Sequence, residues 1–388
     1  MMFPEGGPTV FKDMSKLSFE YLPERLVHRE KQAKRLTTLF RPVIESNVTQ
    51  NAFLTGSVGT GKTHLSKRFC VDFQKYANSK GKNLEYVIVN CRQRNTASAV
   101  LLRVLTHFDE RFPDRGFSIT EMLQILRRHI QKRKTHLLVV LDEADVLLKK
   151  SGSDLIYSLS RFDEESVGQK SSVSMILISQ KYVLDIMDVP SLSTFKRTNI
   201  IEFGKYAADE LRDIIGDRVE LAFHPGMVED QSVSLIADIA SEWGDARYAI
   251  ELLEKAGMLA DEERSREVTP ENVRAAKAET YSTITETKIG ELDPHKKLVL
   301  LGIARRMKRE AYITTGEAEK GYAIACEEFG ERKRAHTQFW KYLKELDALG
   351  LIDTRVSREG MVGKTTMISL PEIPAKVLEE KLESGLRP

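Results

Sequence analysis

Cysteine is scarce in this chain of 388 residues, which has only Cys70, Cys91 and Cys326. Their wide spacing, their odd number and the lack of a CxxC pair argue against a disulfide framework and against a zinc site. This cysteine usage is typical of a protein in a reducing compartment.

Long apolar runs are missing as well. A helix that crosses a bilayer needs roughly 18 consecutive apolar residues, and the longest candidate, around Leu137–Leu141, is cut by Asp142 and Glu143. The N-terminus also lacks the hydrophobic core of a signal peptide. We therefore expect a cytoplasmic, nucleoid-associated protein with no membrane partner.

The chain also lacks a large excess of charge of one sign. Its 59 Lys and Arg residues against 57 Asp and Glu residues leave a net charge of +2. A protein that binds DNA over its whole surface is usually more basic, so a nucleic-acid site here has to be a local patch. The length suits two or three domains.

Apolar runs of strand length alternate with helical patterns in the first half of the chain. These runs are residues 51–56, 85–91, 136–142, 172–179 and 199–203. The alternation predicts a parallel sheet with helices on both faces. After Tyr206 only helical patterns follow, and the pattern resets around Lys288–Pro294, where we expect a linker.

A glycine-rich segment fits the phosphate-binding pattern G-x-x-x-x-G-K-[ST] and lies between an apolar strand and a helix. Its residues are Gly56, Ser57, Val58, Gly59, Thr60, Gly61, Lys62 and Thr63. Backbone amides of such a loop and the N-terminus of the next helix cradle phosphates. Lys62 would reach the β- and γ-phosphates and Thr63 would bind Mg²⁺, so ATP or ADP and Mg²⁺ are the predicted cofactors.

Two adjacent carboxylates follow the most apolar strand, in LLVVLDEAD. Asp142 would hold Mg²⁺ through water, and Glu143 would polarise the attacking water. Lys62, Asp142 and Glu143 are thus the first candidates for catalytic residues. The alternative, a solvated strand end followed by a helix cap, leaves the paired carboxylates unexplained.

The P-loop, the DEAD segment and the all-helical part that follows resemble the AAA+ ATPase family. The resemblance implies a sensor-1 residue at Gln180, or Ser179 beside it, although the family often has Asn there. It implies a sensor-2 arginine at Arg247, in the G-D-A-R pattern of residues 244–247, and a nucleotide contact at Tyr206. The arginine finger has only two poorly aligned candidates, Lys196 and Arg197.

The last hundred residues show three helical patterns followed by two short strands, an order that resembles a winged helix. Its third helix and its hairpin are expected to contact duplex DNA. The candidates near the start of that helix are Arg332, Lys333, Arg334, Thr337 and Gln338, and those on the wing are Arg355, Arg358 and Lys364. Winged helices also serve as protein-binding modules, so that alternative stays open.

The order of these motifs from about residue 20 to 370, together with ERKRAHTQFWKYLKELDALGLI, resembles the archaeal origin-recognition initiators. The resemblance implies binding of replication-origin DNA with ATP binding and slow hydrolysis as a switch, and the replicative helicase and homologous initiator subunits as partners. It also places Val27 and Arg29 against the adenine and a DNA-touching helical insertion within residues 97–130. Other candidates are a clamp-loader subunit, a transposition helper and an ATP-stabilised protein-binding adaptor.

The expected fold is therefore α/β plus all-α plus winged helix: an AAA+ P-loop parallel-sheet domain, a helical lid and a C-terminal winged-helix domain. We expect a flexible N-terminal arm at residues 1–20, the nucleotide-binding base domain at 21–207, the lid at 208–287 and the winged helix at 288–388.

Overall fold

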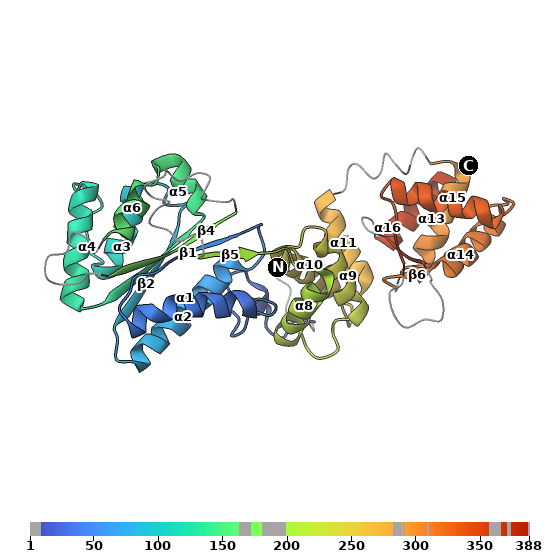
Figure 1. Ribbon diagram of the computed structural model, residues 1–388. Helices are drawn as coiled ribbons and strands as arrows, with labels where there is room; N and C mark the ends of the chain where they lie inside the picture. Colours follow the sequence, from blue (N-terminus) through green and yellow to red (C-terminus); the bar gives the residue numbers. More distant parts are fainter. Residues whose placement is uncertain are drawn as a thin grey trace, which may run out of the picture. The chain divides into compact units, whose positions relative to one another are not determined.

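The structure is a computed structural model, and it describes residues 9–162, 172–180, 199–281, 289, 292–308, 310–356, 366–370 and 374–386. The chain forms two compact units. The base unit comprises Leu22–Tyr206, and the lid–wing unit combines Met1–Tyr21 with Ala207–Pro388. Figure 1 shows the elements of each unit.

A five-stranded parallel sheet is the centre of the base unit. Its strands lie in the order β2-β3-β4-β1-β5, with bounds β1 Asn51–Gly56, β2 Leu84–Asn90, β3 His136–Asp142, β4 Val173–Ser179 and β5 Ile200–Phe203. All four pairings are parallel, and Thr55 lies beside Ser179 while Asn90 lies beside Asp142. The carboxyl ends of the strands thus share one edge, where ligands of open α/β sheets bind.

Alternate residues of the strands enter two separate cores, because successive side chains point to opposite faces. In β1, Phe53 joins the core with α3 Ala97–Phe108, α4 Ile119–Arg133, α5 Ala144–Ser151 and α6 Asp154–Ser160. Ala52 and Leu54 join the opposite core with α1 Glu30–Glu45 and α2 Lys62–Ser79. Figure 1 shows these helices on the two sides of the sheet. This arrangement confirms the predicted parallel sheet with helices on both faces.

The described part of the lid contains the helices α8 Ala208–Ala222, α9 Asp230–Ser241, α10 Ala246–Glu262 and α11 Pro270–Tyr281. Asp245 accepts hydrogen bonds from the amides of Arg247 and Tyr248 at the start of α10, and such a cap stabilises a helix by about 1 kcal/mol.

The expectation of a flexible N-terminal arm is wrong for residues 9–20, which pack on the lid. The amide of Val10 donates to Asp261 (2.7 Å), and the Phe11 ring lies 4.7 Å from that of Phe223. Phe11 also lies so close to Gly257 that a Cβ there would meet the ring at 2.4 Å. A short 3-10 helix, η1 Met14–Leu17, follows and buries Leu17 completely.

The winged helix combines helices α13 Pro294–Arg306, α14 Thr315–Glu328, α15 His336–Ala348 and α16 Ala375–Leu386 with strands β6 Ile313–Thr314, β7 Asp353–Val356 and β8 Thr366–Ser369. The strands form an antiparallel sheet in the order β6-β8-β7. Phe339 and Leu343 of α15 are buried in the core. None of the helices in the described part of the chain is apolar over a length that would cross a membrane.

Candidate nucleotide and DNA-binding sites

The P-loop connects β1 directly to α2 at the carboxyl edge of the sheet. Gly56 has a φ of 150°, and a Cβ at this position would meet the carbonyl oxygen of Phe203 at 2.3 Å. Gly61, the N-cap of α2, has a φ of 89° and no side chain to cap the first amides of the helix. Those amides and the helix dipole are therefore available to an anion.

Lys62 lies inside this loop with 7% of its surface exposed. Its Nζ donates to the carbonyl oxygens of Gly56 (2.8 Å) and Ser57 (2.6 Å). A buried ammonium needs such oxygen partners, and phosphate oxygens are stronger acceptors than carbonyls. The loop therefore fits the phosphates of a nucleotide.

Thr63 and Asp142 meet beside the loop, where the Thr63 hydroxyl donates to Oδ2 of Asp142 at 2.9 Å. Burial raises the pKa of Asp142, while the hydrogen bond from Thr63 acts in the opposite direction. A hydroxyl and a carboxylate oxygen are ligands that Mg²⁺ accepts. The pair therefore fits a magnesium site, where the metal would neutralise phosphate charge.

Glu143 follows Asp142 in a left-handed backbone conformation, with a φ of 56°. Its Oε2 receives a hydrogen bond of 3.0 Å from Nε of Arg92, a residue just after β2. Arg92 is not singled out in the sequence analysis. Its position just after β2, the strand that pairs with β3, could have indicated a cation near Glu143. This ion pair occupies one oxygen of the carboxylate that we predict to orient a water molecule.

The two sensor-1 candidates differ sharply in exposure. Ser179 is 1% exposed, and its hydroxyl donates to Asp145 at 3.3 Å, whereas Gln180 is exposed. Gln180 therefore remains the better prediction for a contact with phosphate. Both arginine-finger candidates, Lys196 and Arg197, lie outside the described residues.

Arg29, which the family resemblance places against the adenine, contacts the P-loop with its guanidinium group. Arg29 is 4% exposed and donates to the carbonyl oxygens of Thr60 (2.9 Å) and Gly204 (2.9 Å). Its Cζ also lies 3.6 Å from the centre of the Tyr206 ring, and Tyr206 is itself buried. Arg29 and Tyr206 thus brace the P-loop, while Val27 is half-buried two residues earlier.

Arg247 belongs to the lid–wing unit, in the first turn of α10. It is exposed, and its guanidinium lies 5.4 Å from the ring centre of Phe19. The N-terminal segment that packs on the lid thus also contributes a contact to the predicted sensor-2 residue.

The predicted DNA contacts near the start of α15 are mostly on the surface. Arg332 and Thr337 are exposed, and Gln338 is half-buried. Lys333 forms an ion pair with Glu319 (2.9 Å), and Nε of Arg334 donates to His295 (3.0 Å). Helix α15 begins at His336, so all three basic residues precede it.

Arg355, which we predict as a DNA contact on the wing, faces the lid. It forms ion pairs with Asp238 of α9 (3.0 Å) and with Asp353 (2.9 Å). The hydroxyl of Tyr312 also donates to Asp238. Arg358 and Lys364, the other two wing candidates, lie outside the described residues.

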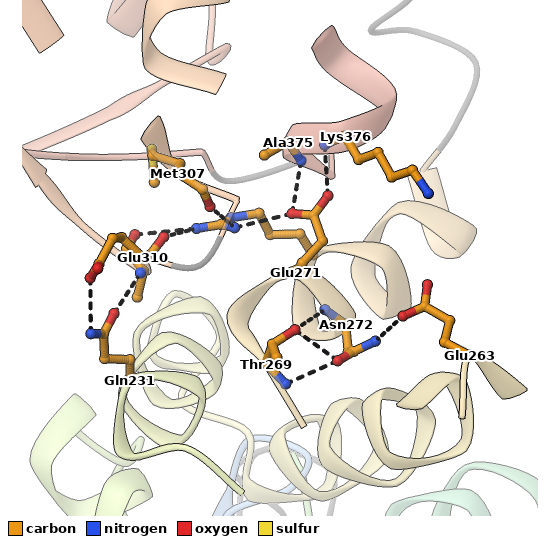
Figure 2. Close-up of polar contacts among 11 residues, drawn as sticks. Gln231, Glu263, Thr269, Glu271, Asn272, Met307, Glu310, Ala375 and Lys376 are labelled. Atoms are coloured by element: carbon orange, nitrogen blue, oxygen red, sulfur yellow. Dashed lines mark hydrogen bonds and ion pairs between the residues drawn. The ribbon is translucent and has the colours of Figure 1, made fainter. Parts of the chain in front are cut away.

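A buried arginine joins the lid to the winged helix (Figure 2). Arg274 of α11 is fully buried and donates to the carbonyl oxygens of Met307 (2.8 Å) and Glu310 (2.6 Å). Glu271, one turn earlier, accepts from the amides of Ala375 (2.9 Å) and Lys376 (2.7 Å) at the start of α16. One turn of α11 thus holds the end of α13 and the beginning of α16.

These features define an AAA+ P-loop ATPase domain followed by a helical lid and a winged helix. Family models match all three parts: an AAA domain at residues 47–187, the Cdc6 AAA+ ATPase-type lid domain at 212–278 and the CDC6 C-terminal winged helix domain at 287–380.

Whole-chain relatives agree with these matches. The chain is 32% identical to the ORC1-type DNA replication protein 2 of Sulfurisphaera tokodaii, over 98% of this chain and 94% of the relative. It is also 32% identical to the ORC1-type DNA replication protein of Thermococcus kodakarensis, over 95% and 90%. The chain therefore belongs to the ORC1/Cdc6 family of DNA replication proteins.

Solved structures show the same architecture. Cdc6p from Pyrobaculum aerophilum is 29% identical, with a TM-score of 0.82 over 97% of this chain and 99% of that one. The Aeropyrum pernix ORC1 protein, solved in complex with DNA, is 30% identical, with a TM-score of 0.65 over 98% and 97%.

Proposed function

We propose that this protein is an ATP-dependent replication initiator. It binds origin duplex DNA through the winged helix and the AAA+ domain, helps to load the replicative helicase and assembles with homologous initiator subunits. The observation that carries the proposal is the start of α15, where Arg332 and Thr337 are exposed beside Arg334 in a helix-turn-helix arrangement. The relative from Aeropyrum pernix that was solved with DNA supports it.

The nucleotide site supports the role of ATP. Lys62 and the loop amides would bind the phosphates, and Thr63 and Asp142 would hold Mg²⁺. Gln180 and the lid residue Arg247 would sense the γ-phosphate, and Val27 would lie against the adenine.

Hydrolysis in this proposal is slow and resets the switch. The ion pair with Arg92 holds Glu143 away from the role of a general base, so a turnover has to begin with the separation of that pair. ATP binding and hydrolysis then act on the position of the lid, and the winged helix follows the lid.

The test is the selection of sheared source DNA on the purified protein with ATP and Mg²⁺, followed by sequencing. We expect a few enriched loci that share a repeated element. Equal retention of all duplex DNA would favour a transposition helper, and no retention would favour a protein-binding adaptor.

A Lys62→Ala variant tests the nucleotide part separately. It removes the charge partner of the β- and γ-phosphates, so we expect loss of ATP binding in isothermal titration calorimetry. Unchanged ATP affinity in this variant would refute the assignment of the P-loop.

A further inference from the structure

Three residues from three different segments meet behind the start of α15. His295 lies in the first turn of α13, Tyr322 in α14 and Arg334 in the segment before α15. Nδ1 of His295 is 2.9 Å from the Tyr322 hydroxyl, and Nε2 of His295 accepts a hydrogen bond of 3.0 Å from Nε of Arg334. The backbone amide of Arg334 also donates to the Tyr322 hydroxyl, at 3.3 Å.

The chemistry of these groups fixes the direction of each hydrogen bond. A guanidinium only donates, so Nε2 of His295 has to be the unprotonated acceptor. Nδ1 therefore carries the proton and donates to Tyr322. Burial raises the pKa of Tyr322 well above its usual value, so its hydroxyl remains protonated.

His295 cannot move easily from this position. It is 7% exposed, and its ring stacks on Tyr342 of α15 with 6.1 Å between centres and 6° between planes. Tyr322 is fully buried. A rigid, buried pair thus holds the side chain and the backbone of a residue that is itself exposed.

Arg334 is held through Nε alone. Within the part of the chain that the structure describes, its two terminal nitrogens form no hydrogen bond or ion pair. A guanidinium fixed in this way has lost side-chain freedom before it meets a ligand, which lowers the entropic cost of binding. Its terminal nitrogens match a pair of acceptors, as offered by O6 and N7 of guanine or by two phosphate oxygens.

We propose that His295 and Tyr322 are positioning residues that hold Arg334 ready for a bidentate contact with such a pair of acceptors on duplex DNA. The inference rests on the proposed DNA-binding function.

The test compares His295→Phe, which keeps a stacking ring but removes both hydrogen bonds, with His295→Gln, whose amide can accept and donate. Binding of a selected origin duplex is measured by fluorescence anisotropy at fixed salt. We expect Arg334→Ala to weaken binding about 5- to 150-fold. His295→Phe should weaken DNA binding by most of that factor, and His295→Gln should restore the wild-type affinity.

A double variant separates positioning from a general effect on folding. If His295 acts through Arg334, then His295→Phe adds no further loss in the Arg334→Ala background. The inference would be overturned if His295→Phe weakens DNA binding equally in the wild-type and Arg334→Ala backgrounds. It would also be overturned if the wild-type protein binds DNA and the single variant His295→Phe binds it equally well. If the wild-type protein binds no duplex at all, the proposed function itself fails, which is a distinct result.

Two further measurements identify the ligand. Replacing guanine by 7-deazaguanine should weaken wild-type binding but not Arg334→Ala if the acceptors are O6 and N7. A salt slope reduced by about one in Arg334→Ala identifies a phosphate instead.

Discussion

The junction between the lid and the winged helix depends on one buried charge, and we predict that Arg274→Met opens it. Arg274 has no exposed side-chain surface and donates to the carbonyl oxygens of Met307 and Glu310. It also lies 3.2 Å from Glu271, whose side chain is 20% exposed. Methionine has a similar length but no donor, so these acceptors lose their partner.

The size of the effect follows from the kind of contact that is lost. Removing one member of a buried ion pair costs about 3–5 kcal/mol, and Glu271 keeps the amides of Ala375 and Lys376 as partners. We therefore expect the lower part of that range, about 3 kcal/mol. In native-state hydrogen exchange, this value corresponds to roughly 100-fold faster exchange of amides at the start of α16.

The measurement is hydrogen exchange followed by mass spectrometry on peptides that cover the end of α13 and the start of α16. Peptides from β3 serve as an internal reference, because they belong to the base unit. Arg266→Met is the matched control, since Arg266 is an exposed lid residue. A change below about threefold in Arg274→Met, or an equal change in Arg266→Met, would refute the reasoning.

Two further predictions concern the base unit. Arg92→Ala frees Glu143 from its ion pair, so ATP turnover should rise roughly two- to fivefold; a lower rate in a steady-state ATPase assay would mean that Arg92 assists catalysis. Burial lowers the pKa of His136 from 6.5 to about 4. The folded protein therefore binds this proton at a lower pH than the unfolded chain does. Stability that is fully present above pH 6.5 is then lost as the pH falls towards 4, by about 2 kcal/mol between pH 7 and pH 5. In His136→Gln, urea unfolding at these two pH values should show a difference smaller by that amount, and an unchanged difference would contradict the assignment.

The parts of this fold that are local in sequence could be predicted. The strand at residues 136–142 has the predicted bounds, because a continuous apolar run ended by Asp142 leaves little choice. The P-loop likewise carries its geometry within eight residues. The start of helix α14 at Thr315 is also local, because the capping box of Thr314 and Glu317 lies within four residues of sequence.

The errors involve partners that lie far away in the sequence. Residues 9–20 read as a loose arm because Asp261 and Phe223, which hold them, come more than 200 residues later. Helix α16 was missed altogether, and the amides at its start are bound by Glu271 of the lid. The prediction for Arg355 rests on its place on the wing, and the sequence does not reveal Asp238 as its ion-pair partner.

A comparison of Arg29, Arg274 and Arg334 shows what distinguishes a structural arginine from a ligand-binding one. Arg29 and Arg274 place their guanidinium groups on backbone carbonyls and are buried, so their charge is committed within the fold. Arg334 is exposed and is held only through Nε, by a neutral imidazole that cannot neutralise its charge. This contact leaves the positive charge of Arg334 uncompensated, so it does not weaken the attraction of Arg334 to a DNA anion. The same contact already orients the side chain, which lowers the entropic cost of binding. An arginine held by a carboxylate, such as Arg355 beside Asp238, would first have to give up that partner.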